Sequence, residues 1–383
     1  MKIPLGVPAA LLLLAMSGRG EDGFRPLFNG HNLDGWVNVN CAPGTWRATN
    51  GLIHCTGFPI GELRTDRMYQ NFILELEWRH LRPQGNAGVF VWADALTAPG
   101  QPFIRGIEVQ VLDGREGTWF TSDGDIFPIH GARMVPINGR GGDRAFPIEK
   151  RSRPSPEWNH YRIECVDGAI SLAVNGKIVT RGHSASPRKG YICLESEGSP
   201  VEFRNLRLRE LPAREALPPE HIAEPALGFH PLYSGVDGSG WHWTEAVARS
   251  WRVEDWTLAS LGGDDATPLV SEHSFGDGEL ILDWRWPDRE QPGDWTRLVR
   301  PRGYNLATVL APWTARDRSG ENPPGQWNRA LLRLRGNHLA IEINGRPLGT
   351  GFELPGIPPQ APLVLIPPPR PAQWANLFWR RLD

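Results

Sequence analysis

Hydrophobic and polar residues alternate along several short stretches of the chain. In "FILELEWR", residues 72–79, large apolar side chains occupy every second position and glutamates lie between them. Successive side chains of a strand point to opposite faces, so this pattern predicts a half-buried β-strand. In "DGAISLAVNGKIV", residues 167–179, Asp-Gly and Asn-Gly pairs flank another alternating run and predict two tight turns around a strand. Many short strands without an amphipathic helical run predict an all-β protein built from two-sheet sandwiches.

The pattern occurs twice along the chain. "FRPLFNGHNLDGW" from Phe24 returns as "FHPLYSGVDGSGW" from Phe229, and "EWNHYRIECVDGAISLAVNGK" returns as "QWNRALLRLRGNHLAIEINGR". A segment rich in proline and alanine, residues 212–228, separates the two copies and reads as a linker. We therefore expect two sandwich domains in tandem, residues 22–211 and 229–383, with the second a degenerate copy of the first.

The first 20 residues have the composition of a secretory signal peptide. Lys2 is followed by a short apolar run, Ile3 to Met16, and then by the small residues Ser17, Gly18 and Gly20. The run is too short for a membrane span, and no later segment reaches 18 apolar residues. We expect a periplasmic or secreted protein without a membrane span in the mature chain.

Charge and cysteine content narrow the choice of partners. The 383 residues include 41 basic and 43 acidic side chains, a formal net charge of -2, and no basic stripe that would indicate a nucleic-acid partner. The four cysteines, Cys41, Cys55, Cys165 and Cys193, do not have the spacing of a zinc site. In an exported protein they either pair, with Cys41–Cys55 as the preferred disulfide, or stay as buried free thiols.

Two strands of the first copy carry carboxylates on one face. In "GIEVQVLDG", Glu108 and Gln110 share one face and the apolar residues share the other, and Glu195 and Glu197 of "CLESEG" share a face in the same way. The residues of the second copy that match the Glu195–Glu197 pair are Val364 and Ile366. A structural role common to both copies would have kept the polarity, so these carboxylates point to a site in the first copy. Surface salt bridges are the alternative explanation of the same glutamates.

The first copy resembles the 3-keto-disaccharide hydrolase family. The resemblance rests on "LFNGHNLDGW", "GNAGVF", "EVQVLDG", "EWNHYRIEC", "LAVNGK" and "GYICLESEG" followed by "VEFRN", in this order over nearly all of residues 24–211. It implies a concanavalin A-like jelly-roll fold and action on glycosides oxidised at carbon 3. The second copy keeps the frame motifs and lacks both acidic strands, so it resembles the fold of the family far more than its site.

This resemblance assigns chemistry to the carboxylates. A ketone at C3 acidifies the C2 hydrogen, so a base can remove it, the C1 substituent can leave, and water can add back to give net hydrolysis. Two adjacent carboxylates raise one another's pKa, which suits Glu195 and Glu197 for a base and acid pair. The candidate catalytic residues are Glu197, Glu195, Glu108 and His130. Either no cofactor is required, or a divalent metal ion held by Glu108, Glu195 and His130 polarises the ketone.

Further residues are candidates for contacts with a carbohydrate. They are Gln110, Asn86, Arg105, Arg140, Lys150 and, in the second copy, Trp286. A tryptophan at 286 stands where the first copy has His80, and its ring would suit stacking on a sugar, with a place in the core as the alternative. A lectin-like protein that binds carbohydrate without turnover remains the alternative function.

Overall fold

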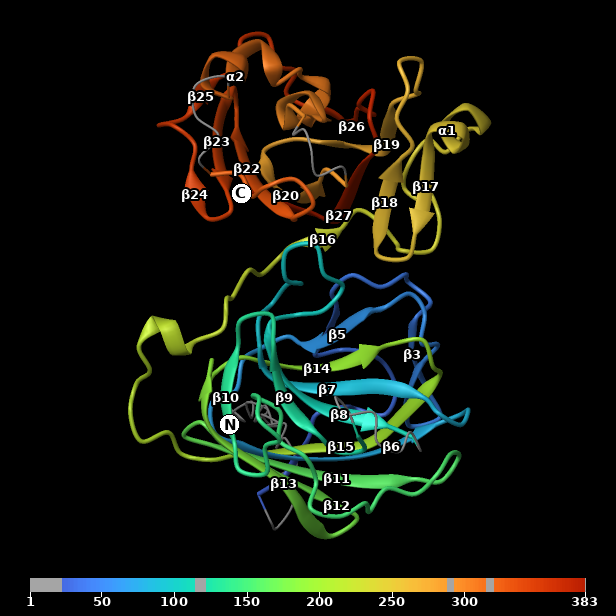
Figure 1. Cartoon of the computed structure of the whole chain (residues 1–383), viewed down its shortest axis with the longest axis vertical. Coiled ribbons are helices and arrows are strands. Elements are labelled where there is room, and N and C mark those ends of the chain that lie inside the picture. Colours follow the sequence, from blue (N-terminus) through green and yellow to red (C-terminus); the bar gives the residue numbers. More distant parts are fainter. Residues whose placement is uncertain (1–22, 114–121, 288–292, 315–319, 383) are drawn as a thin grey trace, which may run out of the picture.

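The structure, a computed structural model, describes residues 23–113, 122–287, 293–314 and 320–382 (Figure 1). It consists of two all-β sandwiches of the concanavalin A-like jelly-roll class, joined in tandem. The predicted signal peptide, residues 1–20, lies outside the described residues. Among those residues, no helix has the length and apolar character needed to cross a membrane.

The first sandwich, blue to green in Figure 1, contains two antiparallel sheets. Along the nine-stranded sheet the order is β10 (Arg133–Pro136), β13 (Lys177–Ser186), β12 (Ala169–Val174), β11 (Asn159–Val166), β6 (Phe72–His80), β15 (Val201–Glu210), β4 (Leu52–Cys55) and β3 (Trp46–Thr49), with β1 (Arg25–Pro26) beside β15. Along the six-stranded sheet the order is β2 (Trp36–Asn38), β5 (Gly61–Thr65), β14 (Tyr191–Ser196), β7 (Asn86–Ala93), β8 (Gly106–Leu112) and β9 (Ile126–Ile129).

The predicted alternation builds the core between these sheets. On β6, Phe72, Leu74, Leu76 and Trp78 are all buried and belong to one apolar cluster. The six-stranded sheet faces them with the apolar residues of β7, β8 and β14, which leaves the polar positions of those strands on the opposite face. The two predicted turns around β12 are present, because Asp167 and Asn175 both have positive φ (49° and 47°) and are followed by glycine.

The second sandwich, yellow to red in Figure 1, has a similar large sheet and a much smaller partner sheet. The large sheet runs β17 (Trp251–Glu254), β18 (Thr257–Ser260), β27 (Ala372–Arg381), β20 (Gly278–Arg285), β22 (Asn328–Arg335), β23 (His338–Ile343) and β24 (Arg346–Pro347), with β16 (His230–Pro231) beside β27 and β25 (Phe352–Glu353) beside β23. The small sheet contains only β19 (Leu269–Phe275), β26 (Ala361–Leu365) and β21 (Val299–Arg300).

Short helices interrupt the strands. They are α1 (Glu245–Ser250), α2 (Ala307–Thr314) and the 3-10 turns η1 (Pro219–His221), η2 (Trp295–Arg297) and η3 (Pro301–Gly303). The sequence did not predict them because none is long enough to show a helical hydrophobic period.

The preferred disulfide prediction is wrong, and its alternative is confirmed. All four cysteines are buried free thiols. The Cys41 Sγ accepts a hydrogen bond from the Trp46 indole at 3.3 Å, and the Cys55 Sγ accepts one from the Gly57 amide at 3.3 Å. Closeness along the chain misled the prediction, because each sulfur is turned toward a different partner.

Candidate active site

The predicted acidic side chains lie on the polar face of the six-stranded sheet. Glu195 on β14 pairs with Glu62 on β5, and Gly88 on β7 pairs with Gln110 on β8. Glu108 precedes Gln110 by two residues and therefore points to the same face. We call the surface formed by Glu62, Glu108, Glu195 and Glu197 the acidic face.

Gly88 lies at the centre of this face. A Cβ atom placed on Gly88 would be 2.9 Å from Glu195 Oε2 and 3.0 Å from Glu108 Oε1. Two carboxyl groups from different strands thus converge on the point where any other residue would have its side chain. The missing side chain therefore allows the two acids to approach each other closely over β7.

Glu62 is a fourth acid of the site that the sequence did not reveal. It is fully buried, and neither of its carboxyl oxygens accepts a hydrogen bond of good geometry, although a contact with the Ile104 backbone opposes the rise in its pKa. A buried carboxyl group without a partner is costly and therefore rare outside functional sites. The available signal was the alternation of "GELR", which puts Glu62 and Arg64 on one face of β5, but four residues are too few to stand out.

Burial dominates the proton affinities of three of these acids. Desolvation raises the pKa of Glu62 well above its usual range, and the negative charges of Glu108 and Glu197 add to the rise. Desolvation and Glu197 raise the pKa of Glu108, and desolvation with Glu108, Glu197 and Glu62 raises the pKa of Glu195. These directions all favour the protonated forms of Glu62, Glu108 and Glu195 over their ionised forms.

Glu197 differs from its three neighbours because it is only half-buried and an amide chain donates to it. The Gln110 side-chain amide donates to Asn86 Oδ1 at 2.7 Å and to the Ala87 carbonyl at 3.1 Å. The Asn86 amide in turn donates to Glu197 Oε2. Glu195 also shares a hydrogen bond with Glu197, and this bond contributes to the raised pKa of Glu195. The bond to Glu197 therefore favours the protonated form of Glu195.

The Arg144 guanidinium borders the acidic face. The Arg144 Cζ lies 3.3 Å from the centroid of the Phe127 ring, and Phe127 pairs with Glu108 across β8 and β9. The Arg144 guanidinium also forms an ion pair with the buried Asp125 at 3.1 Å. Its positive charge counteracts the rise in the pKa of Glu108, so Arg144 acts electrostatically on the site. Arg144 is not among the predicted residues because it comes from a long irregular loop, whose course a single sequence does not show.

Two predicted site residues lie elsewhere, in a hollow of about 630 Å³ between the two sandwiches. The His130 ring stacks on Phe103 with 6.4 Å between centroids, and burial lowers its pKa. Arg105 forms two hydrogen bonds of 2.8 Å with Asp94. His130 follows the end of β9 and faces this hollow, so the structure does not bring it together with Glu108 and Glu195.

The other predicted binding residues have structural partners in the positions they occupy. The Arg140 guanidinium lies 4.1 Å over the Phe146 ring, and Lys150 forms an ion pair with Asp123 at 3.5 Å. Trp286 is only 5% exposed and belongs to the core of the second sandwich, so the core alternative describes its position better than a sugar platform does. Asn86 and Gln110 are the predicted binding residues that the structure brings to the acidic face.

The predicted metal ligands do not form a set. Among residues 23–113, 122–287, 293–314 and 320–382, no group of three or more histidine, cysteine, aspartate or glutamate side chains has the geometry to hold a metal ion. Glu108 and Glu195 converge, but His130 faces the hollow between the sandwiches. Protonated carboxyl groups are also poor ligands, so we derive no step through a metal.

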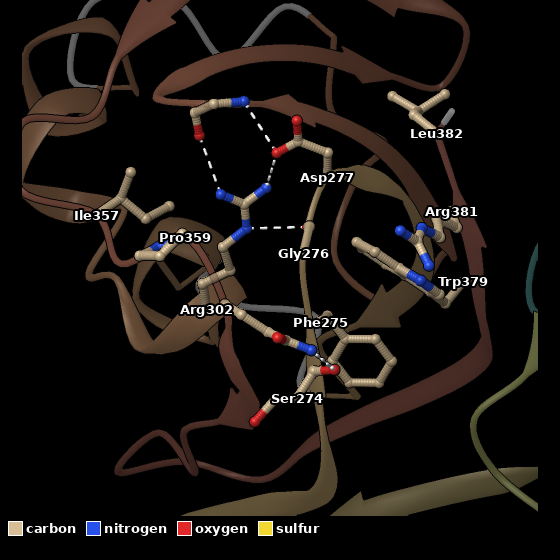
Figure 2. Close-up of a pocket in the computed structure, with 12 residues that line it drawn as sticks. Ser274, Phe275, Gly276, Asp277, Arg302, Ile357, Pro359, Trp379, Arg381 and Leu382 are labelled. Carbon is tan, nitrogen blue, oxygen red and sulfur yellow. Dashed lines mark hydrogen bonds and ion pairs between the residues drawn. The ribbon is translucent and has the colours of Figure 1, made fainter.

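A second hollow, of about 820 Å³, lies in the second sandwich (Figure 2). Among the described residues that line it, Asp277 is the one with a carboxylate, and it accepts hydrogen bonds from the buried Arg302 at 2.5 Å and from the Gly336 amide at 2.9 Å. The described lining of this hollow therefore holds no pair of carboxyl groups like that of the acidic face.

Comparison with known proteins also points to the first sandwich. Residues 23–209 match the 3-keto-alpha-glucoside-1,2-lyase-like domain. The first sandwich belongs to this family. The lyase-like domain therefore contains every residue of the acidic face, together with Asn86, Gln110 and Arg144, and it ends before the second sandwich begins.

Solved structures similar to the chain correspond in length to about one sandwich. A candidate glycosyl hydrolase from Parabacteroides distasonis ATCC 8503 shares 23% identity and covers 50% of this chain and 95% of its own, with a TM-score of 0.40. A second structure of that description from the same organism shares 25% identity over 49% of this chain and 99% of its own, with a TM-score of 0.38. The carbohydrate-binding module CBM66 from Bacillus subtilis shares 14% identity over 46% of this chain and 96% of its own, with a TM-score of 0.36. No curated protein sequence matches the chain.

Proposed function

We propose that the lyase-like domain cleaves the glycosidic bond of 3-keto-glycosides by removing the C2 proton, eliminating the C1 substituent and adding water. The observation that supports this most strongly is the convergence of Glu195 and Glu108 over Gly88, with Glu197 hydrogen-bonded to Glu195. Such a site can hold a base and an acid side by side while the pair shares one proton.

Elimination requires Glu197 as a carboxylate base and Glu195 as a protonated acid. The Glu197 carboxylate takes the C2 proton, and the electron pair of that C–H bond becomes an enolate with the C3 ketone. The enolate collapses to a C1–C2 double bond and expels the glycosidic oxygen, which receives the proton of Glu195. Glu197 is then protonated and Glu195 is ionised.

Hydration runs the same proton transfers in reverse. The Glu195 carboxylate accepts a proton from water while the oxygen of that water adds to C1. Protonated Glu197 then returns a proton to C2. The product is a 3-keto sugar, and both glutamates regain their starting forms. No oxidant or reductant is needed, because the ketone is present in substrate and product alike.

The charge that develops on the C3 oxygen needs a positive neighbour. Arg144 is held at the edge of the acidic face by Asp125 and Phe127 and interacts electrostatically with Glu108. We assign it the stabilisation of the enolate, since a fixed cation in a partly buried site strengthens such an interaction. Gln110 and Asn86 hold Glu197 in place and offer amide groups to sugar hydroxyls.

The test compares a 3-keto-glucoside with its unoxidised parent, each with a chromogenic leaving group. We expect release from the keto form only, and we expect Glu197→Gln to lower kcat by a factor on the order of 10² or more. Glu164→Gln is the matched control, because Glu164 lies on the outer face of β11 with its side chain 45% exposed.

Two outcomes would contradict the proposal. Release from the parent glucoside at a similar rate would indicate an ordinary glycosidase, for which the C3 ketone has no role. Binding of both sugars without release would indicate the lectin-like alternative.

A further inference from the structure

The hairpin loop between β7 and β8 leaves the first sandwich and docks on the second. Within the loop, residues 94–105, the Asp94 amide donates to the Arg105 carbonyl at 3.0 Å and the Ala98 amide donates to the Phe103 carbonyl at 2.8 Å. We call this segment the bridging hairpin. Its two arms continue directly into β7, which carries Asn86 and Gly88, and β8, which carries Glu108 and Gln110.

Asn376 and Asp283 of the second sandwich form hydrogen bonds with the tip of the bridging hairpin. The Asn376 side-chain amide donates to the carbonyls of Ala98 at 2.9 Å and Gln101 at 3.1 Å, and its Oδ1 accepts from the Thr97 hydroxyl at 2.7 Å. Asp283 Oδ2 accepts from the Gly100 amide at 2.7 Å.

Arg329 belongs to the same hydrogen-bond network. Its guanidinium forms a two-pronged ion pair with Asp283 at 2.7 and 2.9 Å and also donates to the Thr97 carbonyl at 2.8 Å. Asn376 donates to Asp283 as well, at 2.7 Å. Asp283 is fully buried and Asn376 is 7% exposed, so water cannot easily replace these bonds.

The fit at the tip is also steric. Gly100 has a φ of 68°, and a Cβ atom on it would lie 2.0 Å from the Trp327 ring. The Trp256 indole donates to the Gly100 carbonyl at 3.2 Å. Only glycine fits between these two tryptophans of the second sandwich.

The bridging hairpin reaches the acidic face through Asn40. The Asn40 side-chain amide donates to the Pro102 carbonyl at 2.9 Å, while its Oδ1 accepts from the Glu62 amide at 3.0 Å. One asparagine thus connects the hairpin to the backbone of the most deeply buried acid of the site.

Apolar packing provides a second connection. Ile104 of the hairpin is fully buried and belongs to one cluster with Phe90 and Cys193 of the six-stranded sheet and with Ile281 and Phe378 of the second sandwich. Phe90 pairs with Glu108 across β7 and β8. The same cluster therefore touches both sandwiches and the strand that positions Gly88.

We propose that the second sandwich is a positioning module for the active site of the first. Asn376, Asp283 and Arg329 hold the bridging hairpin in one place, and the hairpin in turn fixes Glu62 through Asn40 and sets the spacing of β7 and β8 around Gly88. This gives a function to a sandwich that has no acidic face of its own. The activity part of its test rests on the proposed function.

The first sandwich offers a matched control. Asn205 on β15 has a φ of 52°, close to the 50° of Asn376 on β27, and each lies at a shift of register in its strand. The Asn205 amide donates to Glu77 at 3.0 Å, and both residues belong to the nine-stranded sheet, whereas the acidic face lies on the six-stranded sheet. Substitution by glycine removes either side chain and still permits the positive φ.

The experiment measures Asn376→Gly, Gly100→Ala and Asn205→Gly in the full chain. For the first two we expect kcat on the 3-keto-glucoside to fall about tenfold or more with a smaller change in KM, since a misplacement of about 1 Å can cost on the order of 10²-fold in rate. We expect Asn205→Gly to stay within about twofold of the wild type. Gly100→Ala leaves Asn376, Asp283 and Arg329 intact, so agreement between the two variants excludes a folding defect of the second sandwich.

Hydrogen exchange of the Glu62 amide is the second readout, because Asn40 ties that amide to the hairpin. We expect faster exchange at Glu62 in Asn376→Gly and Gly100→Ala, and wild-type exchange in Asn205→Gly. Faster exchange with unchanged kcat would overturn the positioning role, and so would unchanged exchange. If the wild type does not act on the 3-keto-glucoside, the proposed function fails, and exchange at Glu62 alone decides whether the second sandwich controls the acidic face.

Discussion

Glu62→Gln should remove part of the pH dependence of stability of the first sandwich. Both oxygens of Glu62 are buried, and desolvation raises its pKa well above the model-peptide value of 4.5 despite an opposing contact with the Ile104 backbone. Below that value the side chain is protonated in the folded and unfolded chains alike. As the pH rises above it, the unfolded chain releases the proton while the folded chain retains it, so the free energy of unfolding falls.

The magnitude follows from linkage. One such group lowers the free energy of unfolding by about 1.4 kcal/mol for each pH unit between its unfolded-state and folded-state pKa values. Glutamine has the same shape and does not titrate, so Glu62→Gln should lose this slope and gain stability relative to the wild type as the pH rises.

The assay is urea unfolding at pH 5, 6 and 7. Hydrogen exchange of the β6 and β11 amides reports the transition of the first sandwich separately from that of the second, because two-domain chains need not unfold in one step. For Glu164→Gln, whose side chain is exposed on β11, the free energy of unfolding should change with pH as it does in the wild type. If the free energy of unfolding of Glu62→Gln shows the same pH dependence as that of the wild type, Glu62 ionises normally in the folded chain. That result would refute the reasoning about a protonated acidic face.

Three further predictions test other parts of the account. Gly88→Ala should lower kcat on the order of 10²-fold while the fold is kept, because its Cβ would lie 2.9 Å from Glu195 Oε2 and 3.0 Å from Glu108 Oε1 and would displace both acids. Wild-type kinetics would show that catalysis does not depend on this arrangement of the two acids. Arg144→Met should lower kcat by about 10- to 10²-fold, whereas Arg140→Met, which removes a guanidinium stacked on Phe146, should leave it nearly unchanged; equal effects would rule out a specific role for Arg144. The four thiols should resist alkylation until the protein unfolds, and a reductant should not change Tm; a reductant-sensitive Tm would indicate a disulfide.

Alternation along the chain predicted the site strands well. Period two in "GIEVQVLDG" and "CLESEG" placed Glu108, Gln110 and Glu195 on polar strand faces, and the structure has them on one face of the six-stranded sheet, on the two strands that flank β7. The residues of the second copy that match Glu195 and Glu197 are apolar, with Val364 in β26 and Ile366 directly after it. Such predictions work because a strand fixes the direction of every second side chain.

Residues outside regular strands could not be predicted in this way. Arg144 reaches Phe127 from a loop, and His130 follows a strand that ends beside the other sandwich, so their positions depend on loop paths that no period encodes. The grip of Asn376 on residues 97–101 joins segments about 280 positions apart in the chain. Only the folded arrangement shows that the second sandwich and the acidic face are connected.

The most direct test of the account follows the C2 hydrogen of a 3-keto-glucoside during turnover in deuterated water. Proton removal by Glu197 predicts that the product contains deuterium at C2, beyond the slow exchange without enzyme, and that Glu197→Gln abolishes both cleavage and incorporation. A product that retains its original C2 hydrogen, together with no change in rate when C2 of the substrate carries deuterium, would contradict the elimination mechanism.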